Sequence, residues 1–366
     1  MPEQLNDKAY LPSQKIILKG VRWFVAFTVA GIALSFWWKS SANLEQVLSH
    51  INISAALLLL PLSALDSILG GFRYRLFFDG KVLPKISMWD NMRANWANMF
   101  MGAATPFQTG GGPAQFYFLW RCGAKVSEGI LTSSINFSAT LIFFQIASLI
   151  VLFTLPEDLF GGSVVQGIKI AYVVIGTFTA AMLFLLFFPM RGARIISSFF
   201  KLIPRRFQKL QAAKNRLIGM LHEGTRHIGK SFREIVKRKK DALLMSVIST
   251  LMLFFNKFLI GYVVAVALRQ EVDLTVFVGL QILHFFLIYF APTPGASGIA
   301  EVSSVWLMEK VLQPEILLIY TVAWRFFTTY LGALAGSLVV LFEMRTLAKA
   351  EKDVGAGTDQ ESVNTN

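Results

Sequence analysis

The sequence predicts an all-α polytopic membrane protein made of two inverted repeats. Hydrophobic residues make up 54% of the chain, and its mean hydropathy of +0.55 exceeds that of ordinary soluble proteins. These residues gather into runs of about 17 to 25, the length that crosses a hydrocarbon layer roughly 30 Å thick. Two further apolar stretches are interrupted by proline and glycine in corresponding places. Because lipid offers no partner to a backbone amide, the runs are predicted to be helices.

Six runs are long enough to be full spans. They are Val21–Trp38, Ile51–Gly70, Ser127–Thr154, Val164–Phe188, Ala242–Leu268 and Leu317–Phe342. The two interrupted stretches are Trp96–Leu119 and Val276–Leu307. Their breaks fall at Pro106, Gly110, Gly112 and Pro113 in the first, and at Pro292, Pro294, Gly295 and Gly298 in the second.

The distribution of lysine and arginine predicts the orientation. Basic residues precede the first span, so residues 1–15 are expected in the cytoplasm. The basic loop 190–241 and a disordered tail, residues 344–366, then also fall inside. This N-in, C-in topology requires each interrupted stretch to enter and leave on one side. We therefore expect two re-entrant helical hairpins, residues 96–119 opening to the cytoplasm and residues 276–307 opening to the outside.

The order span, span, hairpin, span occurs in residues 16–154 and again in residues 164–343. Each half has three full spans, so the halves must be inverted. Paired interruptions in inverted halves are typical of a transporter's central binding site. Half-helices that begin after Gly112 and Gly295 would direct their N-terminal amides at a polar cavity and favour an anionic group such as a lipid phosphate. The alternative is that the breaks only let helices pack closely.

Several polar residues within apolar segments are candidates for the cavity. Asp66 and Arg73 are seven residues apart and would share a helix face, as a substrate site or as a structural ion pair at the cytoplasmic boundary. Glu301 falls in the first turn after Gly298, where it could face the cavity or simply cap the helix. Arg325, inside the last span, needs a partner, either Glu301 or a substrate phosphate. His284 is a weaker candidate, since packing explains it equally well.

These residues also resemble a known family. The residues that carry the likeness are Asp66, Arg73, Asn98, Thr105-Pro106, Gly110-Gly111, Gln115, the run Pro294–Glu301, and Arg325. They resemble the flippase-like transmembrane region of lysylphosphatidylglycerol synthases over nearly the whole chain. The resemblance implies two re-entrant hairpins around a central cavity and movement of phospholipid between leaflets. It adds Asn98, Thr105, Gln108, Gly111, Gln115 and Ser297 to the expected cavity-lining residues.

The chain departs from the family pattern in three places. Only about two dozen polar residues follow Phe342, too few for the aminoacyl-transferase domain of full-length synthases. The second hairpin reads Pro-Gly-Ala-Ser-Gly where the family often has Pro-Gly-Gly-x-Gly. The first has Ala114-Gln115 where an arginine is frequent, which affects the charge of that arm.

The predicted function is therefore that of a lipid flippase, moving phospholipid or a related amphiphile across the bacterial inner membrane. The alternative is a membrane-embedded lipid-modifying transferase, or a scaffold that presents lipid to a partner enzyme. Catalytic motifs are lacking: His222 and His227 are five residues apart rather than the four of a zinc helix, and no nucleotide motif occurs. We expect no metal and no cofactor. The net charge of +13 is attributed to topology rather than nucleic acid, with anionic lipids as expected partners. Gly332 and Gly336 form a GxxxG motif on the last span, which fits close packing within the bundle as well as a homodimer.

Overall fold

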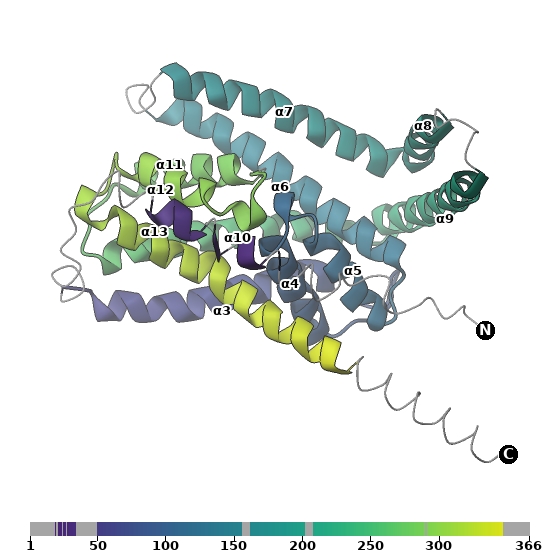
Figure 1. Cartoon of the computed structure of the whole chain (residues 1–366), viewed down its shortest axis with the longest axis horizontal. Helices are drawn as coiled ribbons and strands as arrows, with labels where there is room; N and C mark the ends of the chain where they lie inside the picture. Colours follow the sequence, from purple (N-terminus) through teal and green to yellow (C-terminus); the bar gives the residue numbers. More distant parts are fainter. Residues whose placement is uncertain are drawn as a thin grey trace, which may run out of the picture.

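The protein is all-helical throughout the part that the structure describes (Figure 1). The computed structural model describes residues 50–155, 162–201, 208–289 and 291–346, together with residues 19, 21–23, 25–26 and 28–33. Within these residues, strand pairing is limited to an isolated bridge between Asp79 and Lys85. The all-α class predicted from the sequence is confirmed.

Among the described residues, four helices are long and apolar enough to cross a membrane. They are α3 (Ile53–Arg75), α6 (Val126–Thr154), α10 (Lys240–Ala267) and the continuous last helix Pro314–Thr346. A fifth candidate is α7 (Gly162–Phe187), which bends by 111° into α8 (Pro189–Lys201). The predicted first span is represented by the shorter apolar helix Val21–Ala33, and its remainder lies outside the described residues. The chain is thus a multi-pass membrane protein.

The last helix is not uniform. It begins with the 3-10 turn η5 (Pro314–Ile316), continues as α13 (Leu317–Arg325), and then opens into the π-helical turn η6 (Phe326–Tyr330). After this turn, Gly332 and Gly336 pack against α4: a Cβ at Gly336 would collide with the Trp96 carbonyl. The paired glycines therefore serve packing within the bundle.

Both interrupted stretches form helical hairpins. The first consists of α4 (Met88–Ala103), the turn η2 (Pro106–Gln108) and α5 (Gly111–Arg121). The second consists of α11 (Leu274–Ile288), the turn η4 (Pro294–Ala296) and α12 (Ile299–Met308). The arms of each hairpin pack together, and the turns η2 and η4 contact each other. At 1.5 Å per residue, the 16-residue α4 is about 24 Å long, so it is too short to cross the hydrocarbon layer.

The half-helices begin at the predicted breaks, within a few residues of the expected glycines. Helix α5 begins at Gly111 rather than after Gly112, because glycine and Pro113 are tolerated in a first helical turn. Helix α12 begins at Ile299 rather than directly after Gly295, which places Glu301 in the first turn after Gly298 as expected. Its N-cap is Gly298, whose φ of 82° lies in the left-handed region that favours glycine, so the helix can begin only beyond it.

The two hairpins open toward opposite ends of the molecule. At one end, Lys239 Nζ lies 2.7 Å from Asp79 Oδ2, and Arg121 Nε lies 3.0 Å from Glu343. This basic end holds the open arms of the first hairpin. At the other end, the Asn52 amide donates to the Ala267 carbonyl at 2.8 Å, in the loops next to the open arms of the second. The two turns therefore meet between the ends.

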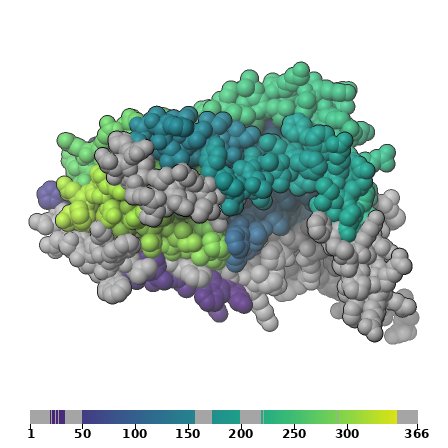
Figure 2. Space-filling model, turned by 90° about the horizontal axis from the view of Figure 1, so that it is seen from above, coloured from purple at the N-terminus to yellow at the C-terminus, as the bar shows by residue number. Residues whose placement is uncertain are grey.

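The basic loop contains two helices, α8 and α9 (Gln208–Arg238). Helix α9 docks on the start of α6, where His227 Nδ1 lies 3.1 Å from Ser127 Oγ and its Nε2 lies 3.3 Å from Lys125 Nζ. Figure 2 shows the face on which α7 and α8 lie across the molecule. Contact of these helices with an anionic membrane surface stays a prediction. The predicted tail beyond Thr346 lies outside the described residues.

Candidate functional site

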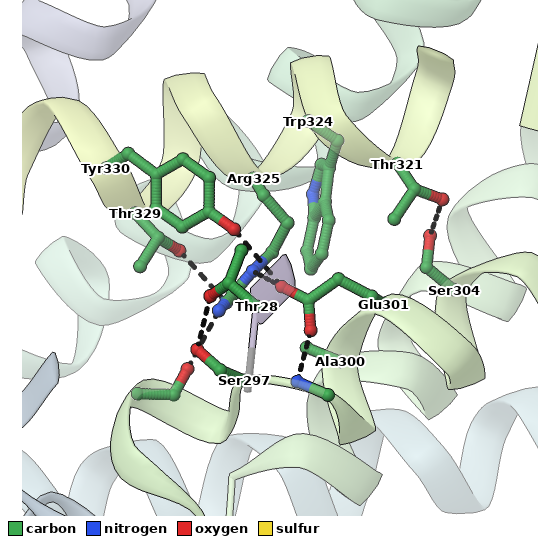
Figure 3. Close-up of polar contacts among 12 residues, drawn as sticks. Thr28, Ser297, Ala300, Glu301, Ser304, Thr321, Trp324, Arg325, Thr329 and Tyr330 are labelled. Atoms are coloured by element: carbon green, nitrogen blue, oxygen red, sulfur yellow. Dashed lines mark hydrogen bonds and ion pairs between the residues drawn. The ribbon is translucent and has the colours of Figure 1, made fainter. Parts of the chain in front are cut away.

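The centre of the candidate site is an ion pair between Glu301 and Arg325 (Figure 3). Glu301 is the third residue of α12, and its Oε2 accepts a hydrogen bond of 2.6 Å from the Gly298 amide. Its Oε1 accepts from Arg325 Nε at 3.0 Å and from the Tyr330 hydroxyl at 3.2 Å. Both members of the pair are almost fully buried, at 1% and 2% exposure. The carboxylate thus caps α12 and pairs with the arginine at once.

Arg325 also holds the turn of the second hairpin. Its Nη2 donates to the Gly295 carbonyl at 2.9 Å, and its Nη1 donates to Thr329 Oγ1 at 3.3 Å. The guanidinium carbon lies 5.4 Å from the centre of the Tyr330 ring, within the range of a cation–π contact. Thr329 and Tyr330 both belong to the π-helical turn, a type of turn that is frequent at functional sites.

The helix that begins at Val21 closes over the same turn. Thr28 Oγ1 donates to Ser297 Oγ at 2.9 Å, and Ser297 is fully buried. One turn later, a Cβ on Gly31 would lie 2.7 Å from the Gly298 Cα, so the two backbones touch. The second break is therefore covered by this helix as well as held by Arg325.

The first hairpin has its own polar set. Asn98 Nδ2 donates to Gln115 Oε1 at 2.8 Å, which joins α4 to α5, and a Cβ on Gly111 would lie 2.7 Å from Asn98 Oδ1. Thr105 Oγ1 donates to the Met101 carbonyl at 2.7 Å and accepts from the Gly110 amide at 2.8 Å. These bonds satisfy the backbone at the break.

The tip of the first hairpin is strained and exposed. Phe107 and Gln108 have φ values of 52° and 56°, in the left-handed region, and both side chains are exposed. Such a conformation costs a non-glycine residue roughly 1–2 kcal/mol. Strain of this kind is concentrated at functional sites.

Asp66 and Arg73 do not form the structural ion pair that was one of the two alternatives. Asp66 instead pairs with Lys257 of α10, whose Nζ lies 2.8 and 2.9 Å from the two carboxylate oxygens. Arg73 Nη2 donates to the Asn136 carbonyl at 2.6 Å and to Thr140 Oγ1 at 3.0 Å, both on α6. Helices α3 and α10 pack along each other. The Lys257 ammonium therefore lies closer to Asp66 than the guanidinium of Arg73 does, two turns away on α3.

Asp66 lines a cavity of about 180 Å³ between α3, α4 and the last helix. Trp96 and Thr328 also line it. Gly70 and Gly71 do not interrupt α3, because they pack against Asn95 and Met92 of α4. The cavity therefore lies beside a continuous helix rather than at a break.

His284 fits the packing alternative. Its Nε2 lies 3.1 Å from the Ala300 carbonyl, and its ring lies 4.7 Å from the Trp324 ring. It links the two arms of the second hairpin.

The predicted site residues therefore fall into separate groups. Ser297, Glu301 and Arg325 come together at the second break; Asn98, Thr105, Gly111 and Gln115 come together at the first; Asp66 and Arg73 lie elsewhere along α3. The sequence reasoning missed Thr28, Lys257 and Tyr330 as partners. Lys257 carried a signal, since an ionisable residue within a span needs a partner. Nothing in the sequence marks Thr28 or Tyr330.

Among the described residues, four membrane-length helices, two opposed helical hairpins and a buried ion pair where the hairpin turns meet define an all-helical polytopic membrane protein. The defining pattern of the lysylphosphatidylglycerol synthase transmembrane region matches residues 23–336, so the chain belongs to this family. The chain is also similar to a UPF0104 membrane protein of Archaeoglobus fulgidus, with 24% identity over 269 residues. That match covers 71% of this chain and 78% of the relative.

Proposed function

We propose that this chain is a lipid flippase of the bacterial inner membrane, which moves phospholipid or a related amphiphile between leaflets without a chemical step. The observation that carries the proposal is the contact between η2 and η4, the turns of two hairpins that open to opposite ends. If both hairpins are re-entrant, the chain has six spans in two inverted halves, with both termini in the cytoplasm. A site between such hairpins can be opened to either side in turn.

Arg325 is the residue to which a lipid headgroup would bind. Its three acceptors are the Glu301 carboxylate, the Gly295 carbonyl and the Thr329 hydroxyl. A phosphate offers oxygens that can replace all three, and arginine binds such groups through paired hydrogen bonds. Once a phosphate takes these donors, the turn at Gly295 loses its anchor. Headgroup binding would thereby loosen the second hairpin.

The test is a leaflet-exchange assay on purified protein in liposomes that contain fluorescent phospholipids. Dithionite bleaches the outer leaflet, so exchange appears as loss of the protected fraction. We expect exchange with the native chain and its loss with Glu301→Gln and with Arg325→Ala. The matched controls are Glu234→Gln and Arg238→Ala, which change an exposed ion pair of 2.9 Å on α9 and are expected to leave exchange unchanged.

Protein-free liposomes set the baseline. The proposal fails if native protein does not differ from that baseline for any headgroup tested. It also fails if the folded Glu301 and Arg325 variants exchange lipid at the native rate. Circular dichroism of each variant shows whether it is folded before reconstitution.

A further inference from the structure

A second cavity lies at the basic end of the molecule, away from the Glu301–Arg325 pair. It has a volume of about 190 Å³ and lies where α4 begins, α5 ends and the last helix ends. Its lining residues are Asp90, Arg93, Phe118, Arg121, Cys122 and Glu343. The volume is below that of pockets for drug-sized ligands, so the cavity suits a headgroup rather than a whole lipid.

Glu343 is the inner wall of this cavity. Its side chain is 10% exposed, and its Oε1 accepts from the Tyr117 hydroxyl at 3.0 Å and pairs with Arg121 Nε at 3.0 Å. Its Oε2 lies 3.9 Å from Arg93 Nη2, beyond hydrogen-bond distance. One buried carboxylate therefore draws two arginines toward it from two arms of the first hairpin.

The guanidinium groups of Arg93 and Arg121 have more N–H donors than their contacts in this cavity use. The side chains of Arg93 and Arg121 are 32% and 39% exposed. Arg121 meets Glu343 through Nε, and Arg93 meets Asp90 Oδ1 at a long 3.4 Å. A guanidinium has five N–H groups, so most of the donors in this cavity are not used by these contacts. An oxyanion that entered would find two cations positioned side by side.

The charges of the lining sum to zero, because two arginines are balanced by two carboxylates. A purely anionic headgroup would face Asp90 and Glu343, and juxtaposed like charges are costly. A headgroup that carries both a phosphate and an ammonium would match both signs. The Asp90 carboxylate, 30% exposed, lies at the outer part of the cavity, where an ammonium could reach it.

We propose that this cavity binds the headgroup of a zwitterionic phospholipid, with the phosphate on Arg93 and Arg121 and a primary ammonium on Asp90 and Glu343. Its role as the loading site for transport rests on the proposed function. The two arms that carry Arg93 and Arg121 lead directly to the turn η2, so a lipid bound here lies at the open mouth of the first hairpin.

The chain supplies its own probe, because Cys122 is its single cysteine and lines the cavity. The experiment measures the rate of Cys122 alkylation in uncharged detergent micelles, with phosphatidylethanolamine or phosphatidylglycerol added. Burial raises the pKa of the Cys122 thiol, so all rates are compared at one pH. We expect phosphatidylethanolamine to slow alkylation several-fold and phosphatidylglycerol to slow it much less. In Glu343→Gln, whose lining carries one net positive charge, we expect the order of the two lipids to reverse.

Cys122→Ser combined with Lys81→Cys is the control, because it moves the thiol to an exposed loop at the same end. No lipid should protect that thiol. Equal protection of Cys122 by both lipids, in the native chain and in Glu343→Gln, would overturn the proposal. Lipid that merely covers this end of the protein would not distinguish between headgroups. If soluble glycerophosphoethanolamine protected Cys122 from alkylation and phosphatidylethanolamine did not, the ligand of the cavity would not be a lipid.

This measurement does not depend on transport. Selective protection of Cys122 in a chain that fails the leaflet-exchange assay would keep the headgroup site and reject the flippase. Leaflet exchange without protection would keep the flippase and reject this site.

Discussion

Replacing Arg325 by methionine tests whether the buried ion pair is as strongly coupled as its geometry indicates. Methionine keeps the apolar stem of the side chain and removes the guanidinium. The change deprives the Glu301 carboxylate of its cation, and it leaves the Gly295 carbonyl without its side-chain donor. Glu301 retains the Gly298 amide and the Tyr330 hydroxyl.

The expected cost follows from the burial of both partners. Removing one member of a buried ion pair costs about 3–5 kcal/mol of unfolding free energy, because the remaining charge is uncompensated. Glu301→Gln should cost less, since glutamine can still accept from the Gly298 amide and Arg325 keeps two other acceptors. The double variant leaves no charge at the site. It should therefore be more stable than Arg325→Met alone.

The assay is equilibrium unfolding of the native chain and the three variants in mixed micelles, followed by circular dichroism. The double-mutant cycle gives the coupling energy, expected near the upper end of the usual 0.5–3 kcal/mol range. A loss below about 1 kcal/mol in Arg325→Met would refute the reasoning. So would a double variant whose loss equals the sum of the two single losses.

Three further predictions follow from particular contacts. Lys257→Met should lower the unfolding free energy by about 3–5 kcal/mol, because it strands the Asp66 carboxylate in the membrane, and combining it with Asp66→Asn should restore part of that loss in the same micelle assay. Gly336→Ala should cost about 1–3 kcal/mol by driving the last helix off α4, whereas Gly219→Ala on α9, where a Cβ meets nothing within 4 Å, should be neutral or stabilising. Burial raises the pKa of the Asp79 carboxyl, but the hydrogen bonds from Lys239 and from the Lys81 amide, together with the charges of both lysines, outweigh burial and lower it. The folded pKa lies below the unfolded one, so the contribution of Asp79 is complete above the ordinary carboxyl pKa and is lost as pH falls through the folded pKa. An acid titration of stability should show this loss in the native chain and not in Asp79→Asn.

The sequence predicted the breaks well because proline and glycine restrict the backbone locally. Pro106 and Pro294 each begin a short turn, and Gly298 takes a conformation that other residues rarely adopt. The pairing of Glu301 with Arg325 was also predictable, since a buried guanidinium requires a partner and few carboxylates were near in sequence. These inferences used short segments of the chain.

Contacts between distant segments could not be predicted in the same way. Asp66 and Lys257 are 191 residues apart, and Thr28 and Ser297 are 269 apart. Hydrophobic periodicity gives the face of a helix but not the helix that packs on it. The left-handed conformation of Phe107 and Gln108 had no sequence signal either, because neither residue is a glycine or an asparagine.

The π-helical turn Phe326–Tyr330 changes the direction in which the side chains on either side of it point around the axis of the last helix. A π turn holds one more residue than an α turn, and each residue turns an α-helix by about 100°. Because of that extra residue, Arg325 can face the second hairpin while Gly332 and Gly336 face the first. The last helix therefore contacts both hairpins. In an unbroken α-helix of this sequence, Arg325 and the two glycines would point in different relative directions. If the extra residue migrated by one turn, the guanidinium would rotate away from Glu301 while both ends of the helix kept their places.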